Sequence, residues 1–143
     1  MNILLLSCGT RNKVVQYFKK ELAGKGKVFA TDCSELAPAL YEADKYFVVP
    51  RINEDGYIDK ILNICRENNI NGVLSLIDPE LSLLAKYKQD FLNIGTIPII
   101  SDFDVVEMCF DKFEMYQFLV KNGFKTARSY IDKEKFYEDV KSG

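Results

Sequence analysis

The chain has 143 residues, enough for one domain with a single hydrophobic core. Its net charge of −2 at pH 7 argues against a general nucleic-acid or membrane surface. No apolar run approaches the about 20 residues that a membrane-spanning helix needs, and the first run, "ILLLS", lacks the flanks of a signal peptide. Histidine is absent from the sequence, which excludes Ser-His-Asp and Cys-His catalysis and nearly every zinc site that uses histidine.

Strand-like and helix-like segments alternate along the chain. The first strand-like run, "NILLLS", is continuously apolar, which is typical of a strand buried on both faces of a parallel sheet. Because short connections join the segments, they predict an α/β fold of the Rossmann-like, three-layer kind, with a mostly parallel sheet of about five strands. The predicted strands span residues 2–7, 26–32, 45–50, 72–77 and 96–101.

Capping residues predict where the helices of this domain begin. Thr10 is the expected N-cap of the first helix, and Ser34 that of a short helix that follows the second strand. Asp78, with Pro79 at the first helical position, opens a helix that continues through Leu92.

Residues 1–103 are therefore expected to form the Rossmann-like domain, and residues 104–143 a C-terminal helical connector with a short extended segment. Two capping-box patterns occur in the connector, Asp104–Glu107 and Asp111–Glu114. The second predicts a helix break near Phe110, with Lys112 at the first position of the new helix. An apolar stripe along these helices is predicted to enter the core, and a last short helix is predicted around Phe136, Tyr137 and Val140. The stripe consists of Val106, Cys109, Phe110, Phe113, Tyr116 and Val120.

The four cysteines lie far apart, beside apolar or strand-like sequence. No CxxC spacing and no secretory signal accompany them, so we expect reduced core thiols in a cytoplasmic protein. They are Cys8, Cys33, Cys65 and Cys109.

Ligands of such sheets bind at the carboxyl ends of the strands, so the residues that follow the strands are the candidate site. After the first strand, Gly9 permits a tight turn, and Thr10 and Arg11 lie at a helix N-terminus that favours an anion. The alternative is that Thr10 only caps the helix and that Arg11 is solvated. After the fourth strand, the carboxylate of Glu80 could hold a substrate ammonium or order a water, or it could only complement the helix dipole.

Nucleotide motifs give little support to a dinucleotide enzyme. Asp32, at the end of the second strand, could bind a ribose hydroxyl, but GxGxxG, GxxxxGK[ST] and a helical Tyr-x-x-x-Lys pair are missing. Lys112 adds a cation to a helix N-terminus, which is unfavourable unless an anion is near. The alternatives for Lys112 are a phosphate contact and an ordinary surface lysine.

The segment "FDKFEMYQFLVKNGFKTARSY" (residues 110–130) resembles the link between the N-terminal domain of ATP-grasp ligases and their nucleotide-binding domain. "TARS" is most similar to the large chain of carbamoyl-phosphate synthase and its stand-alone relatives. "MNILLLSCG", "ATDCSELAPALYEADKYFVVP" and "DPELSLLAK" likewise resemble the pre-ATP-grasp domain of this family.

This resemblance implies a ligase in which ATP phosphorylates a carboxylate and an amine or ammonia displaces the phosphate. It places Lys112 at a position that touches the nucleotide phosphates. It also places Gly9, Thr10, Arg11 and Glu80 at the edge of the acceptor-substrate pocket. No catalytic residue and no metal ligand is expected in this chain, because magnesium and most ATP contacts belong to the following domain.

Residues 104–143 are thus expected to hold the connector and the start of an ATP-grasp domain, and the chain stops before the strand lysine, glycine-rich loop and acidic metal ligands of that domain. We therefore expect a fragment that has no ligase activity alone and whose partners are the missing domain and small carboxylate and amine substrates. Neither a nucleic acid nor a membrane is expected as a partner, and the oligomeric state is left open. The alternative function is a free-standing Rossmann-like module that binds a small anionic metabolite or nucleotide through Gly9–Arg11 and Glu80.

Overall fold

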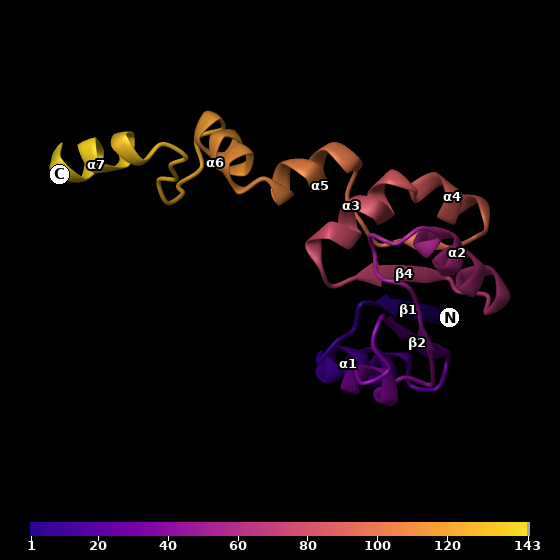
Figure 1. The fold of residues 1–143 in the computed structure, drawn as a ribbon. Coiled ribbons are helices and arrows are strands. Elements are labelled where there is room, and N and C mark those ends of the chain that lie inside the picture. Colours follow the sequence, from indigo (N-terminus) through magenta and orange to yellow (C-terminus); the bar gives the residue numbers. More distant parts are fainter. Residues whose placement is uncertain (143) are drawn as a thin grey trace. The chain divides into compact units, whose positions relative to one another are not determined.

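A computed structural model describes residues 1–142 of the chain, which divides into two compact units, Met1–Phe103 and Asp104–Gly143 (Figure 1). The first unit contains the sheet and the helices that cover it, and the second, over residues 104–142, contains helices and the segments that join them but no strand. That the second unit acts as a connector stays a prediction.

The first unit is built on a five-stranded parallel sheet in the order β3-β2-β1-β4-β5. The chain runs outward from β1 to β3 and then crosses back to β4 on the other side of β1. The predicted α/β Rossmann-like class is thus confirmed. The strands are β1 (Asn2–Leu6), β2 (Lys27–Asp32), β3 (Lys45–Val48), β4 (Gly72–Ser75) and β5 (Ile97–Pro98).

Helices cover both faces of this sheet, α1 and the 3₁₀ helix η1 on one face and α2, α3 and α4 on the other (Figure 1). Successive side chains of a strand point to opposite faces, so Leu4 and Leu6 of β1 pack with α2–α4, whereas Ile3 and Leu5 pack with α1 and η1. This two-sided burial is why β1 is a continuous apolar run. The helices are α1 (Asn12–Leu22), η1 (Pro38–Glu42), α2 (Tyr57–Glu67), α3 (Asp78–Lys86) and α4 (Lys88–Asn93).

The predicted start of α1 is wrong by one residue. Its N-cap is Arg11, without a side-chain capping bond, and not Thr10. Thr10 lies in a turn that is closed by the hydrogen bond from the Arg11 N–H to the Cys8 carbonyl oxygen (2.9 Å), and the helix begins only after this turn.

The helices predicted from Ser34 and from Asp78 also begin elsewhere. The Ser34 hydroxyl accepts from the Leu36 N–H (3.2 Å) in a local turn, and η1 begins only at Pro38, whose fixed φ suits a first helical turn. Asp78 is the first residue of α3 and Ile77 is its N-cap, and the long helix predicted through Leu92 is divided at Tyr87.

The second unit contains α5 (Phe103–Phe110), which begins at the unit boundary, α6 (Lys112–Lys121) and α7 (Lys133–Ser142). The predicted break after Phe110 is confirmed, because the Asp111 carboxylate accepts from the N–H groups of Phe113 (2.9 Å) and Glu114 (3.0 Å). The last short helix is confirmed as α7. Asp104 lies inside the first turn of α5 and is not its N-cap, so the other capping box is wrong.

The apolar stripe of the second unit is not the core that its spacing predicts. Val106 is buried, but Cys109, Phe110 and Val120 are exposed, and neither α6 nor α7 contains a buried residue. Helical spacing predicts which side chains share a face, but only tertiary contacts decide whether that face is covered. No helix among residues 1–142 is long and apolar enough to cross a bilayer.

Two of the four cysteines are core thiols and two are not. Cys8 and Cys65 are buried, and burial raises the pKa of both thiols to about 12. Cys33 and Cys109 are exposed, which corrects the expectation for these two. Cys33 directly follows β2, where the chain leaves the sheet.

We predict that a thiol reagent at pH 8 modifies Cys33 and Cys109 in the folded chain and leaves Cys8 and Cys65 unmodified. Reaction requires an accessible thiolate, which burial and a raised pKa deny to the latter two. Absorbance of the released thiolate from an aromatic disulfide reagent, with and without urea, measures both classes. Cys33→Ser should remove one equivalent from the folded-state count, and rapid modification of all four thiols without urea would contradict the described burial.

Candidate functional site

A small pocket opens at the carboxyl ends of the strands, where the direction of strand succession reverses between β1 and β4. This is the place at which open α/β sheets bind their ligands. The volume is about 230 Å³, and the lining comes from the ends of all four strands β1–β4 and from the loop before α2. We call it the crevice pocket; its lining residues are Ser7, Cys33, Val49, Pro50, Arg51, Ile52, Asn53, Tyr57 and Ile77.

Beside this pocket, the carboxylate of Glu80 is buried in a cage of hydroxyl groups. Glu80 has an exposed fraction of 0% and lies in the first turn of α3. Its Oε1 accepts from the Ser7 hydroxyl (2.9 Å) and from the Tyr57 hydroxyl. Its Oε2 accepts from the Ser75 hydroxyl (2.5 Å). The carboxylate thus joins the ends of β1 and β4 to the starts of α2 and α3.

The charge environment of this cage is unusual, because no ion pair joins Glu80 to a lysine or arginine within residues 1–142. A buried carboxylate is costly unless hydrogen bonds replace its hydration, and charge-assisted bonds from hydroxyls do so here. Burial, followed by the adjacent Glu80 carboxylate, raises the pKa of Tyr57. Tyr57 therefore stays protonated and donates a hydrogen bond to Glu80.

The loop after β1 has a strained backbone, which Asp32 holds in place. Ser7 adopts φ +45°, in the left-handed region that favours glycine, and Gly9 adopts φ +51°. Asp32 fixes the loop, because its Oδ2 accepts from the Gly9 N–H (2.8 Å) and its Oδ1 accepts from the Ser34 N–H (3.0 Å). These two backbone bonds give Asp32 a structural role in fixing the loop, without a ribose contact.

The four predicted substrate-binding residues, Gly9, Thr10, Arg11 and Glu80, do not line the crevice pocket. Gly9, Thr10 and Arg11 belong to the loop after β1; Thr10 is exposed, and Arg11 Nη1 donates to the Ser7 carbonyl oxygen (3.3 Å). Glu80 meets the same loop through Ser7. Since its carboxylate is fully buried, it can reach a ligand only through the hydroxyls that surround it.

Sequence reasoning predicted none of the lining residues as site residues, and Tyr57, Arg51 and Cys33 are three of those that it missed. Arg51 is the only charged side chain of the lining. Arg51 and Cys33 follow strands, as Gly9 and Glu80 do, so the same positional criterion could have identified them. Tyr57 gave no such signal, because it begins α2 and its hydroxyl reaches Glu80 across 23 residues of sequence.

Lys112 begins α6 in the second unit and is exposed. Its ammonium donates to the carbonyl oxygen of Cys109 (2.8 Å), in the last turn of α5. A cation at a helix C-terminus is favourable, which explains a lysine here without an anion. Nothing in this contact tests the predicted phosphate role.

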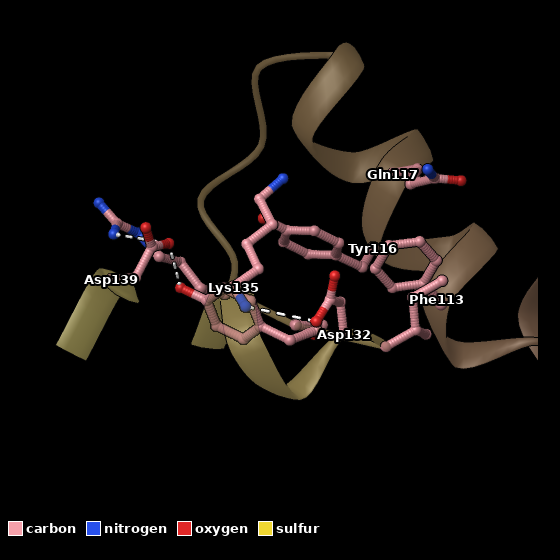
Figure 2. Close-up of a pocket in the computed structure, with 10 residues that line it drawn as sticks. Phe113, Tyr116, Gln117, Asp132, Lys135 and Asp139 are labelled. Atoms are coloured by element: carbon pink, nitrogen blue, oxygen red, sulfur yellow. Dashed lines mark hydrogen bonds and ion pairs between the residues drawn. The ribbon is translucent and has the colours of Figure 1, made fainter. Parts of the chain in front are cut away.

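The second unit has a larger pocket of about 560 Å³, between α6 and the segment that leads into α7 (Figure 2). Figure 2 shows Phe113, Tyr116 and Gln117 of α6 on one side of the pocket and Asp132, Lys135 and Asp139 on the other.

Both carboxylates of this second pocket bind groups of the chain itself. Asp139 accepts from the Tyr130 hydroxyl (2.7 Å) and lies 3.7 Å from a guanidinium nitrogen of Arg128, and Asp132 accepts from the Glu134 N–H (2.8 Å). They hold the segment to α7 and do not converge on a ligand position. Residues 1–142 contain no group of three or more His, Cys, Asp or Glu side chains arranged to bind a metal.

The family model described as "PylC-like, N-terminal domain" matches residues 3–100 of the chain. Comparison with curated protein sequences found no match. Solved structures with the same fold include N5-carboxyaminoimidazole ribonucleotide synthetase from Thermotoga maritima (20% identity, TM-score 0.64). They also include N5-carboxyaminoimidazole synthetase from Staphylococcus aureus complexed with ADP (16%, 0.63) and L-amino acid ligase from Bacillus licheniformis (16%, 0.62).

Each of these structures matches 99% of the chain, which in turn covers 36%, 36% and 41% of their lengths, respectively. The chain therefore spans well under half of the proteins that it resembles. At these identities the likeness establishes the fold, which is that of the N-terminal domains of ATP-grasp enzymes.

We predict that Glu80→Ala lowers the free energy of unfolding by about 3 kcal/mol, because it leaves three hydroxyl groups without their charged acceptor. Urea unfolding followed by circular dichroism measures the change. Glu67→Ala, at an exposed position of α2, is the matched control and should change stability by less than about 0.5 kcal/mol. Equal effects of the two substitutions would show that the hydroxyl cage contributes nothing to stability.

Proposed function

The chain belongs to the PylC-like N-terminal domain family, and we propose that it forms the substrate-side domain of an ATP-dependent carboxylate–amine ligase. The observation that carries the proposal is the family match over residues 3–100, together with a ligand crevice at the carboxyl ends of β1–β4. The similar structures support the same chemistry, because one is an ADP complex and another is named an amino acid ligase.

In such a ligase a carboxylate oxygen attacks the γ-phosphorus of ATP and ADP leaves. The amine nitrogen then attacks the acyl carbon, the C–N bond forms, and phosphate and a proton are released. Both steps depend on holding the reacting groups together and apart from water. The chain would contribute the wall of the acceptor-substrate pocket, formed by the loop Gly9–Arg11 and by the cage around Glu80.

Lys112 would contact the nucleotide phosphates. Its side chain is exposed and makes a single hydrogen bond, to the Cys109 carbonyl oxygen, which a change of rotamer can break. A lysine serves as a point charge for phosphate, so this contact needs no fixed geometry. Magnesium and the remaining ATP contacts are assigned to a following domain of the longer protein.

A second function is favoured by one observation: the crevice pocket is formed within residues 1–103 alone. A free-standing module that binds a small anionic metabolite or nucleotide would therefore need no further domain. It would use the loop Gly9–Arg11, with Arg11 for the anion, and Glu80, which lie beside the pocket lining and are linked to Ser7.

We predict that magnesium ATP binds the 143-residue chain only weakly, in the millimolar range, since most nucleotide contacts lie outside it (about −4 kcal/mol). Calorimetry should detect no micromolar binding. In an NMR titration, the amide shifts should centre on Lys112. They should be lost in Lys112→Ala and kept in Lys121→Ala, at the other end of α6.

Micromolar ATP binding by the chain would contradict the proposed division of the nucleotide site between two domains. A saturable response to inorganic phosphate that Arg11→Ala abolishes would instead favour the second function.

A further inference from the structure

The two hydroxyl groups shared by the crevice pocket and the Glu80 cage have a fixed hydrogen-bond polarity. Ser7 and Tyr57 line the pocket, and both bind Glu80 Oε1. A carboxylate only accepts hydrogen bonds, and a hydroxyl has a single hydrogen to donate. With Glu80 ionised, each hydroxyl gives its hydrogen to the carboxylate and has only lone pairs to offer a ligand.

The third hydroxyl secures this polarity. Ser75 accepts from the Ile77 N–H (3.2 Å), and its hydrogen has two acceptors, Glu80 Oε2 (2.5 Å) and the more distant Ile77 carbonyl oxygen (3.3 Å). Tyr57 is 3% exposed and its pKa is raised, which keeps its proton in the bond to Glu80. The cage thus has little freedom to turn a hydrogen toward the pocket.

Charge acts in the same direction at this wall of the pocket. Behind the two hydroxyls lies a carboxylate with no cationic partner within the described chain. A positively charged hydrogen-bond donor on the pocket side would be attracted both by the lone pairs and by the charge behind them. Arg51, the one charged side chain of the lining, forms no ion pair within residues 1–142 and is exposed.

We infer that Ser7 and Tyr57, oriented by Glu80, are specificity-determining residues that select a ligand bearing an N–H donor, and that Arg51 receives the anionic group of the same ligand. The ligand class is a small zwitterion with a primary ammonium, consistent with a pocket of about 230 Å³. The inference rests on the proposed function only in identifying this ammonium with the amine that the ligase would join.

The test compares two zwitterions of the same charge, glycine and N,N,N-trimethylglycine, in which three methyl groups replace the N–H hydrogens, in NMR titrations of the isotope-labelled chain. Glycine should give saturable amide shifts at Ser7, Tyr57 and Ile77. Trimethylglycine has the same charges but no donor, and it should bind at least about ten-fold more weakly. Equal responses to the two ligands, or no saturable response to glycine, would overturn the inference.

Two variants examine the orientation of the hydroxyls. Tyr57→Phe removes one acceptor and should weaken glycine binding several-fold, whereas Tyr41→Phe, at an exposed tyrosine outside the pocket, should not. In Glu80→Gln the side-chain amide can donate, so a hydroxyl is released to turn its hydrogen toward the pocket. The preference for glycine over trimethylglycine should then fall to near one. A Glu80→Gln chain that is folded by circular dichroism yet keeps the full preference would contradict the inference.

The ligand comparison needs no variant and no ATP, so its failure can be told apart from failure of the proposed function. If glycine binds with the expected preference but the longer protein forms no ADP from ATP with any amine, the proposed function fails and the selectivity of the pocket stands. If amine-dependent ADP formation is found while the chain ignores glycine, the selectivity fails and the proposed function stands.

Discussion

One buried carboxylate joins the elements that form the crevice. Glu80 of α3 holds Ser7 after β1, Tyr57 at the start of α2 and Ser75 at the end of β4. These are the elements on both sides of the reversal in strand order, where a parallel sheet leaves its strand ends unpaired and open to a ligand. Among the described residues, hydroxyl groups, and not a lysine or arginine, bind this carboxylate. Because the hydrogens of Ser7 and Tyr57 point to Glu80, these two hydroxyls offer the pocket hydrogen-bond acceptors.

The sheet could be predicted from the sequence because its strands are buried on both faces. Leu4, Leu5 and Leu6 are all fully buried, so β1 is a continuous apolar run that can be predicted without an alternation of apolar and polar residues. Helix starts were harder to predict, because a capping residue such as Thr10 or Ser34 serves equally well in a turn. Glu80 could be singled out as a candidate from its position after a strand, and its role as a site residue stays a prediction. The partners of Glu80 could not be singled out, because Ser7 lies 73 residues away and local patterns contain no information on such contacts.

The second unit shows the same limit in a different form. Asp111 could be predicted as a cap because capping is local, and the structure confirms it. The exposure of Phe110 and Val120 could not be predicted, because it depends on what packs against their face. A unit of this size with no buried residue in α6 or α7 has little core of its own. Lys112 is now bound to the end of α5, so a phosphate contact would have to compete with that bond.

The left-handed backbone of Ser7 sets stability against recognition. At φ +45° a glycine would relieve the strain, whereas the serine retains it and keeps a hydroxyl at the mouth of the crevice. Replacement of Ser7 by glycine would therefore relax the backbone, but it would remove one of the two hydroxyl acceptors and leave only Tyr57. Such a chain would fold readily and distinguish its ligands poorly, so selection for stability alone and selection for specificity favour different residues at position 7.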